Sequence, residues 1–169
     1  SARLSAITGC QTDRMTRDSG WRLLFIGRLL ERLSFLSQTL EMALAGQVLG
    51  EVEGFEAVMS LFDSTITFHA RHQQRRNLVT LCDLLVLDDE NPRALAWVIR
   101  SIRSHLDKLA ALQGGNQPRL AELLPNPDHW DTLALSTGAH TEAQLIDLLD
   151  QLSHAAWALS DAIASRTFT

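Results

Sequence analysis

The stretch from Gly20 to Phe35, GWRLLFIGRLLERLSF, most constrains the fold, because it is apolar over most of its length and yet carries four charged residues. At 100° per residue, Arg28 and Arg32 lie within about 20° of the direction of Trp21. Leucine, isoleucine and phenylalanine occupy most of the remaining circumference. The pattern predicts a helix that is largely buried in a bundle.

Charges buried in this way need partners, since removing one member of a buried ion pair typically costs about 3 to 5 kcal/mol. Glu31 follows Arg28 by three residues, which is close enough for the two to pair on a helix. A second predicted helix carries polar residues at helical spacing that could supply further partners. The expected polar centre comprises Arg28, Glu31, Arg32, Asp63, Thr67, Arg71, Gln74 and, from a later helix, Arg93.

Two short sets of residues are expected to form the rim of this centre. Arg14, Arg17 and Asp18 precede the first helix, and Trp97 and Arg100 lie on the side of a later helix that faces away from its apolar stripe. Two interpretations remain open at this point. The charges form a structural network between helices, or several arginines converge on a phosphate or carboxylate, to which guanidinium groups bind in a bidentate manner.

Composition and periodicity predict an all-α fold, because tyrosine is absent, leucine and alanine are abundant, and few segments alternate as a half-buried strand would. We expect a bundle of about five to seven helices in one domain over residues 1–169, with long first, second and last helices. The first should run from Asp18 or Ser19 to Ala45, and the second from about residue 53 to Arg76. A short apolar helix should follow over 77–88, and then a helix with Asn91 as its N-cap and Pro92 in its first turn. A proline-containing connection over 119–139 and a last helix from Thr141 should come next.

Charge, hydrophobicity and cysteine content indicate which partners and which compartment to expect. A formal net charge of -5 argues against nucleic acid. No apolar run approaches the roughly 20 residues of a membrane span, so no membrane partner is expected. Two cysteines without a Cys-x-x-Cys pair fit a reducing cytoplasm. The chain begins without methionine, which suggests a fragment of a longer polypeptide.

Signals for a metal or cofactor are weak. His69 and His72 have i, i+3 spacing, but no carboxylate nearby completes a Glu-x-x-His pattern, so no metal site is predicted. Cys82 lies in an apolar stretch and is expected to be buried and unreactive. No phosphate-binding loop, dinucleotide motif or nucleophile elbow occurs, and no cofactor is expected.

Four stretches together resemble the alpha-E domain family, bacterial helical proteins named for a Glu-Arg pair, which here is Glu31-Arg32. They are GWRLLFIGRLLERLSFL, DSTITFHARHQQRR, DLLVLDDENPRALAWVIRSIRSHLDKL and ALSDAIASR, and they cover most of the chain in the same order. The chain also resembles the form fused behind a circularly permuted ATP-grasp domain, in which AQTDRMTRD commonly precedes the first helix, as CQTDRMTRD does here.

The resemblance implies a role beside ATP-grasp ligases, often with transglutaminase-like proteins, in a system that forms or modifies peptides. It implies no established activity for the helical domain itself. Carried onto this sequence, the family's motif residues are Arg28, Glu31, Arg32, Asp63, Thr67, Arg71, Asn91, Pro92 and Arg93.

Three functional hypotheses follow. In the first, an accessory domain docks an ATP-grasp ligase domain or its acidic peptide substrate and holds an anionic group with Arg28, Arg32, Arg71 and Arg93. In the second, a hydrolase or transferase uses Glu31 or Asp63 as general acid or base. In the third, the domain is structural or mediates oligomerisation through an exposed face of Arg93, Trp97 and Arg100.

Overall fold

The computed structural model describes residues 17–72, 75–114 and 119–168, and within them every regular element is helical. The all-α prediction is therefore confirmed, as is a bundle with long first and last helices. The elements in chain order are α2 (Arg17–Ala45), η1 (Val48–Gly50), α3 (Val52–Leu61), α4 (Thr65–His72), α5 (Leu78–Leu81), the π-helical turn η2 (Cys82–Leu87), α6 (Leu95–Leu112), η3 (Leu120–Leu123), η4 (Pro127–His129), α7 (Thr132–Thr137) and α8 (Thr141–Phe168).

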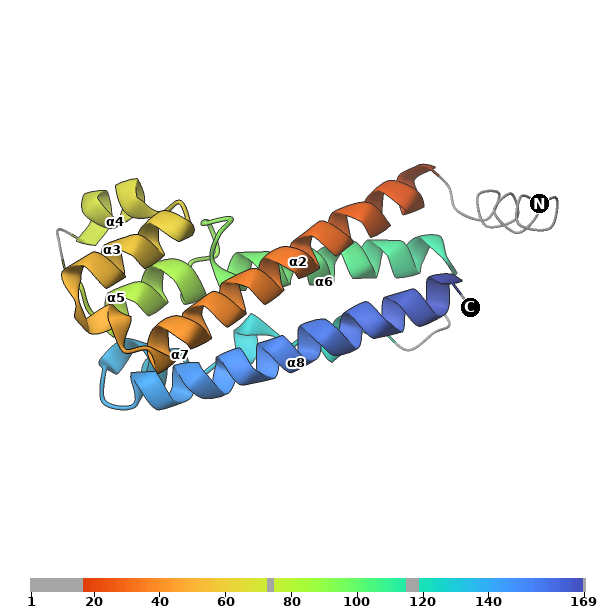
Figure 1. The fold of residues 1–169 in the computed structure, drawn as a ribbon. Helices are drawn as coiled ribbons and strands as arrows, with labels where there is room; N and C mark the ends of the chain where they lie inside the picture. Colours follow the sequence, from red (N-terminus) through yellow and green to blue (C-terminus); the bar gives the residue numbers. More distant parts are fainter. Residues whose placement is uncertain (1–16, 73–74, 115–118, 169) are drawn as a thin grey trace.

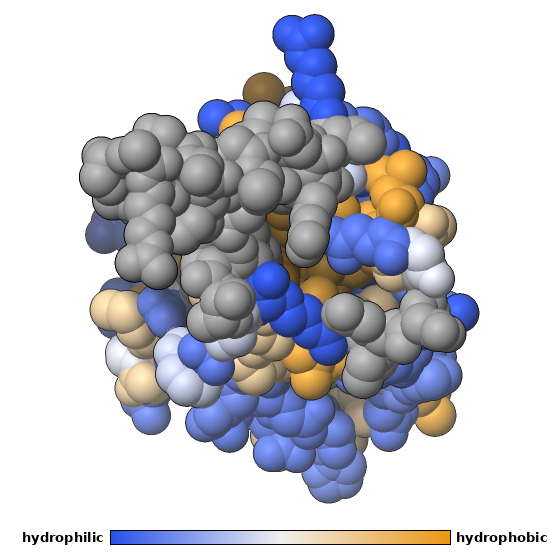
Figure 2. All heavy atoms as spheres, turned by 90° about the vertical axis from the view of Figure 1, so that its right-hand side faces the viewer, coloured by the Kyte–Doolittle hydropathy of each residue, from blue (hydrophilic) through white to orange (hydrophobic). Residues whose placement is uncertain are grey.

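Three long helices form the body of the molecule. α2 runs antiparallel to α6 and α8 and packs against both, while the short helices α3, α4, α5 and α7 gather at one end (Figure 1). Leu33 and Leu40 of α2, Ile99 of α6 and Leu149 of α8 are fully buried in the shared core. At the other end, mostly hydrophilic side chains are seen on the coloured surface, with apolar side chains near its centre (Figure 2).

The prediction of a second long helix is wrong, because this part of the chain forms two shorter helices, α3 and α4. Asp63 adopts a left-handed conformation (φ 49°), which ends α3, and the amide of Ser64 donates to the carbonyl of Met59 at 2.9 Å. In a continuous helix Phe68 would point about 240° away from Phe62, six residues earlier. The break instead lets both phenylalanines reach the core, where Phe62 is 1% exposed and Phe68 is 0% exposed.

An aromatic cluster joins α2 to α6. The ring of His105 lies edge-on to Phe25, with centroids 4.8 Å apart, and Trp21 stacks on Phe25 at 5.4 Å. Nη1 of Arg22 lies 3.1 Å from Nδ1 of His105, so Arg22 donates to a neutral imidazole that carries its proton on Nε2. Burial, followed by the charges of Arg22 and Lys108, lowers the pKa of His105 from its usual value.

The lowered pKa of His105 predicts a pH-dependent stability. Below the usual histidine pKa of about 6.5, the unfolded chain binds a proton that the folded chain still resists, so the free energy of unfolding should fall as the pH falls from about 7 toward 5. We expect His105→Gln to reduce this fall, measured as urea unfolding across that range. An identical pH dependence in both proteins would contradict the assignment.

Two glycines should respond to alanine in opposite ways. A Cβ at Gly54, in α3, would lie 2.1 Å from the carbonyl oxygen of Val48, so Gly54→Ala should destabilise by about 1 to 3 kcal/mol. A Cβ at Gly27, in α2, meets nothing within 4 Å, so Gly27→Ala should stabilise by about 1 kcal/mol through helix propensity. Urea denaturation of the two variants and the wild type measures both effects. Equal effects would mean that Val48 does not approach α3 this closely.

Candidate functional site

The outward face of α2 carries the predicted Glu-Arg pair. Arg28, Glu31 and Arg32 are all exposed, and so is Trp21, whose direction they share. The prediction of a buried charged centre on this helix is therefore wrong. The helix buries the opposite face instead, because leucines at positions 29, 33, 36 and 40 contact α6 and α8.

The segment 88–93 (DDENPR), which we call the 88–93 loop, brings several of the predicted residues together. Nη1 of Arg71 donates to Oδ2 of Asp88 at 2.8 Å, and Nη2 of Arg93 pairs with Oδ2 of Asp63 at 3.3 Å. Arg32 reaches the same loop, since its Nη1 donates to the carbonyl of Pro92 at 3.2 Å. Residues from α2, from α4 and from the turn at Asp63 thus meet the 88–93 loop, as the motif suggested, but at the surface.

Asn91 holds the 88–93 loop against the buried part of the molecule. Its Nδ2 donates to the carbonyl oxygen of Leu84 at 3.0 Å and to Oγ of Ser64 at 3.3 Å, while its Oδ1 accepts from the amide of Arg93. Asn91 is not the N-cap of α6, contrary to our expectation, because that helix begins later, with Ala94 as its N-cap. The side-chain amide of Asn91 satisfies a carbonyl of the π-helical turn η2. Such turns are rare overall, but those that occur often lie at functional sites.

Arg100 extends the polar surface along α6. Its Nη2 donates to Oδ1 of Asp128 at 2.8 Å, and its Nη1 lies 4.0 Å from Oδ2 of Asp89. The hydrogen bond from Arg100 is the main reason that the pKa of Asp128 is lowered from its usual value. Trp97 is partly buried and packs against the core, so it belongs to the interior more than to the expected rim.

The remaining predicted residues do not join this cluster. Asp18 accepts a hydrogen bond from Nε of Arg22 at 3.1 Å, one turn along α2. Within the part of the chain that the structure describes, the side chains of Arg28, Glu31 and Thr67 enter no hydrogen bond or ion pair, and Thr67 is half-buried. Arg17 is exposed at the first position of α2, whereas Arg14 and Gln74 lie outside the described residues.

The weaker signals resolve into structural roles. Cys82 is fully buried, and burial raises the pKa of its thiol to about 12, which makes it a poor nucleophile. His69 lies beside Glu56, with Nε2 and Oε2 3.5 Å apart, and Arg76 donates to the same carboxylate at 2.7 Å. Among the described residues, no group of three or more histidine, cysteine, aspartate or glutamate side chains could hold a metal ion.

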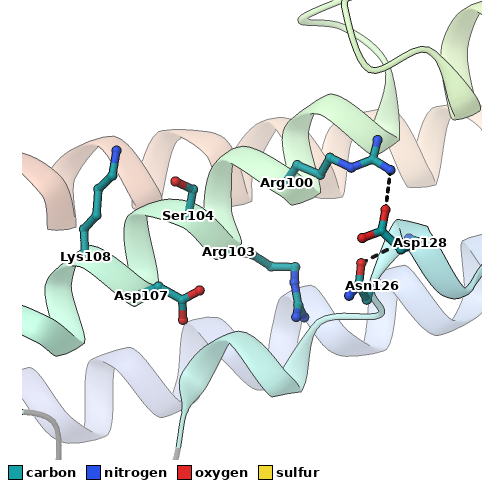
Figure 3. Close-up of a pocket in the computed structure, with 7 residues that line it drawn as sticks. All are labelled: Arg100, Arg103, Ser104, Asp107, Lys108, Asn126 and Asp128. Carbon is teal, nitrogen blue, oxygen red and sulfur yellow. Dashed lines mark hydrogen bonds and ion pairs between the residues drawn. The ribbon is translucent and has the colours of Figure 1, made fainter.

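Sequence reasoning missed a groove of about 450 Å³ between α6 and the connection over residues 119–131 (Figure 3). Only long-range folding brings the two walls together, although the charges on α6 at positions 100, 103, 107 and 108 were visible in the sequence. The residues that line it are Arg100, Arg103, Ser104, Asp107, Lys108, Asn126 and Asp128.

The fold and the polar surface define an all-helical domain whose charged motif lies on its outside. Residues 1–168 match a family described as a predicted alpha-helical domain with a conserved ER motif. The chain belongs to this Alpha-E family. Its sequence contains a single Glu-Arg dipeptide, Glu31-Arg32, which is where we place that motif.

Similar proteins are much longer than this chain. Uncharacterised proteins of Mycobacterium bovis and of two strains of Mycobacterium tuberculosis are 24% identical over 119 residues, which is 69% of this chain but only 14% of each relative. No solved structure matches. None of the helices among the described residues is long and apolar enough to cross a membrane.

The contacts of Asn91 predict that it matters more for folding than the exposed pairs around it. Asn91→Ala would leave the carbonyl of Leu84 without this donor and should destabilise by about 1 to 3 kcal/mol. Arg71→Ala, which breaks an ion pair at a half-exposed arginine, should cost about 1 kcal/mol or less. Chemical denaturation measures the free energy of unfolding of both variants. A larger decrease for Arg71→Ala than for Asn91→Ala would contradict the structural role that we assign to Asn91.

Proposed function

We propose that this chain is an accessory domain that docks a partner domain through the outward face of α2. The single observation that carries the proposal is the exposure of large apolar side chains there: Trp21 is 54%, Leu24 59%, Phe35 51% and Met42 74% exposed. Successive members of this set are three, eleven and seven residues apart, spacings that return to nearly the same side of a helix, so they lie along one face of α2. Large exposed apolar side chains that lie along one face with polar neighbours are typical of a protein interaction site.

The charged motif lies among these apolar side chains. Arg28 and Glu31 fall between Leu24 and Phe35 on the same face, at spacings that continue the pattern. Interfaces commonly surround apolar anchors with polar groups that fix the register of the partner. We infer that the Glu-Arg motif orients the partner on α2, with Arg28 and Arg32 available to carboxylates of that partner.

The resemblance to ATP-grasp fusion proteins supplies the identity of the partner that we propose. The matched region makes up 14% of each mycobacterial relative, so domains of this kind occur within much longer chains. We propose that the partner is an ATP-grasp ligase domain, in the same polypeptide or as a neighbour, acting on peptides in the cytoplasm. A mixed apolar and charged face suits such a domain contact better than it suits a purely structural core.

The enzyme hypothesis gains less support. Glu31 and Asp63 line neither the groove on α6 nor the hollow of about 240 Å³ beside Trp130. The side chain of Asp63 is 80% exposed and already pairs with Arg93. A general acid or base needs a site that holds its substrate. The oligomerisation hypothesis is also weakened, because Arg93 and Arg100 are engaged in ion pairs and Trp97 packs against the core.

The docking proposal predicts the effect of polar substitutions on α2. The double variant Leu24→Gln/Phe35→Gln should weaken binding to a circularly permuted ATP-grasp domain by tenfold or more, because each exposed anchor would lose its buried contact. Calorimetric titration of the ligase domain into the chain measures the dissociation constant. Leu24→Gln should leave thermal unfolding unchanged, whereas Phe35→Gln also loses an edge-on contact with the buried Phe62 (ring centroids 6.4 Å apart), so the double variant is first shown to be folded by thermal unfolding.

Ile66→Gln is the matched control, because Ile66 is 86% exposed on α4, at the end of the molecule that holds the short helices. It should leave binding unchanged. Equal weakening by the control and the double variant would contradict the proposal. Loss of a homodimer in sedimentation velocity, without any ligase binding, would assign the α2 face to a second copy instead.

A further inference from the structure

The groove on α6 contains three cationic side chains along one stretch of helix. Arg100 and Lys108, with Arg103 between them, are eight positions apart, or about 12 Å at 1.5 Å per residue. Lys108 and Ser104 extend from the same side of α6, while Arg103 and Asp107 point toward the 119–131 connection (Figure 3). The cavity therefore follows the helix and does not converge on a single point.

Arg103 is held in place before any ligand arrives. Its Nη1 donates to the carbonyl oxygens of Ala121 at 2.6 Å and Leu124 at 2.9 Å. In the described part of the chain, its Nε and Nη2 enter no other hydrogen bond, so three N–H donors remain for a ligand in the groove. A fixed guanidinium loses little freedom when it binds a carboxylate.

The charges of the groove select the kind of anion. Arg100 and Asp128 neutralise each other through their 2.8 Å hydrogen bond, which leaves Arg103 and Lys108 against Asp107. The remaining charge is about one positive unit, distributed along the groove. Singly charged carboxylates spaced along a chain fit this distribution, whereas a compact phosphate dianion would lie against Asp107 or Asp128 without satisfying both cations.

We propose that this groove binds an acidic peptide segment in extended conformation. About 12 Å corresponds to three or four residues of extended chain, and a volume of 450 Å³ accommodates such a segment. One carboxylate binds Arg103 and another binds Lys108, while Asp107 accepts a backbone N–H of the peptide. The inference goes beyond docking by α2 and does not depend on it, because peptide binding requires no ligase domain.

Lys108 makes a direct test feasible, because it is the only lysine in the sequence. The probe is tetraglutamate with an acetylated amino end and an amidated carboxyl end, so that the peptide offers carboxylates and no amine. A carbodiimide should join a glutamate of the probe to Nζ of Lys108, and peptide mapping by mass spectrometry should find that amide. Tetraglutamine with the same ends should not react, and the amino terminus of the protein serves as an internal control for nonspecific coupling.

Calorimetric titration of tetraglutamate into the full chain measures the dissociation constant of the peptide. Tetraglutamate should bind, inorganic phosphate should bind at least tenfold more weakly, and Lys108→Gln should weaken tetraglutamate binding about tenfold. Lys108→Arg should keep the affinity and abolish the cross-link. Arg28→Gln, which removes one exposed positive charge from α2, should leave peptide binding unchanged and so separates this site from the docking face.

Three results would overturn the proposal. They are absence of tetraglutamate binding at millimolar concentration, cross-linking confined to the amino terminus, and phosphate binding as tightly as the peptide. Arg103→Gln is the second variant, with thermal unfolding measured first, since it also loses the bonds to Ala121 and Leu124. If Arg103→Gln is unfolded, the proposal is tested by Lys108→Gln alone, and unchanged tetraglutamate binding by that variant would contradict it.

Discussion

The one-sided burial of α2 is the constraint on which the rest of the structure depends. Leu29, Leu33, Leu36 and Leu40 place one side of this helix against α6 and α8, and all four are at most 2% exposed. Once that face is buried, Arg28, Glu31 and Arg32 must lie on the other, where water solvates them and no desolvation cost arises. The same geometry leaves Phe35 and Met42 exposed, on the face that we propose as a docking surface.

The 88–93 loop explains how a polar motif can matter for folding although it lies at the surface. Exposed ion pairs such as Arg93 with Asp63 contribute little individually. Asn91 differs from them, because it supplies a donor to the carbonyl of Leu84 beneath the loop and bonds to the buried Ser64 at the break between α3 and α4. The loop therefore joins the short helices at one end of the molecule to the start of α6.

The sequence predicted the features that depend on local chemistry. The end of the first helix at Ala45, where glycines follow, and the start of the last at Thr141 were correct, whereas Asp18 and Ser19, the expected caps of the first helix, lie within α2. Asp63 and Arg93 were both named through the family resemblance, and the structure pairs them at the surface. The phase of α2 was wrong because apolar residues surround it: Trp21 and Phe35 look as suitable for a core as Leu29 and Leu33, and only the positions of α6 and α8 decide between them.

Other features depended on contacts that no local pattern encodes. The break at Asp63 arises because Phe62 and Phe68 must both reach the core, which is a tertiary requirement. The π-helical turn over Cys82–Leu87 has an ordinary apolar sequence. The groove could not be predicted either, since its second wall comes from a connection whose carbonyls at Ala121 and Leu124 meet Arg103 only in the folded chain.

The position of α6 between the two proposed surfaces gives them a functional relationship. His105 contacts Phe25 of α2, whereas Arg103 bonds to Ala121 and Leu124, and two residues along a helix correspond to a rotation of about 200°. The part of the groove at Arg103 therefore faces away from α2, whereas Lys108, about 60° around the helix from His105, lies at its flank. A partner docked on the outward face of α2, as we propose, would therefore leave most of the groove open to solvent.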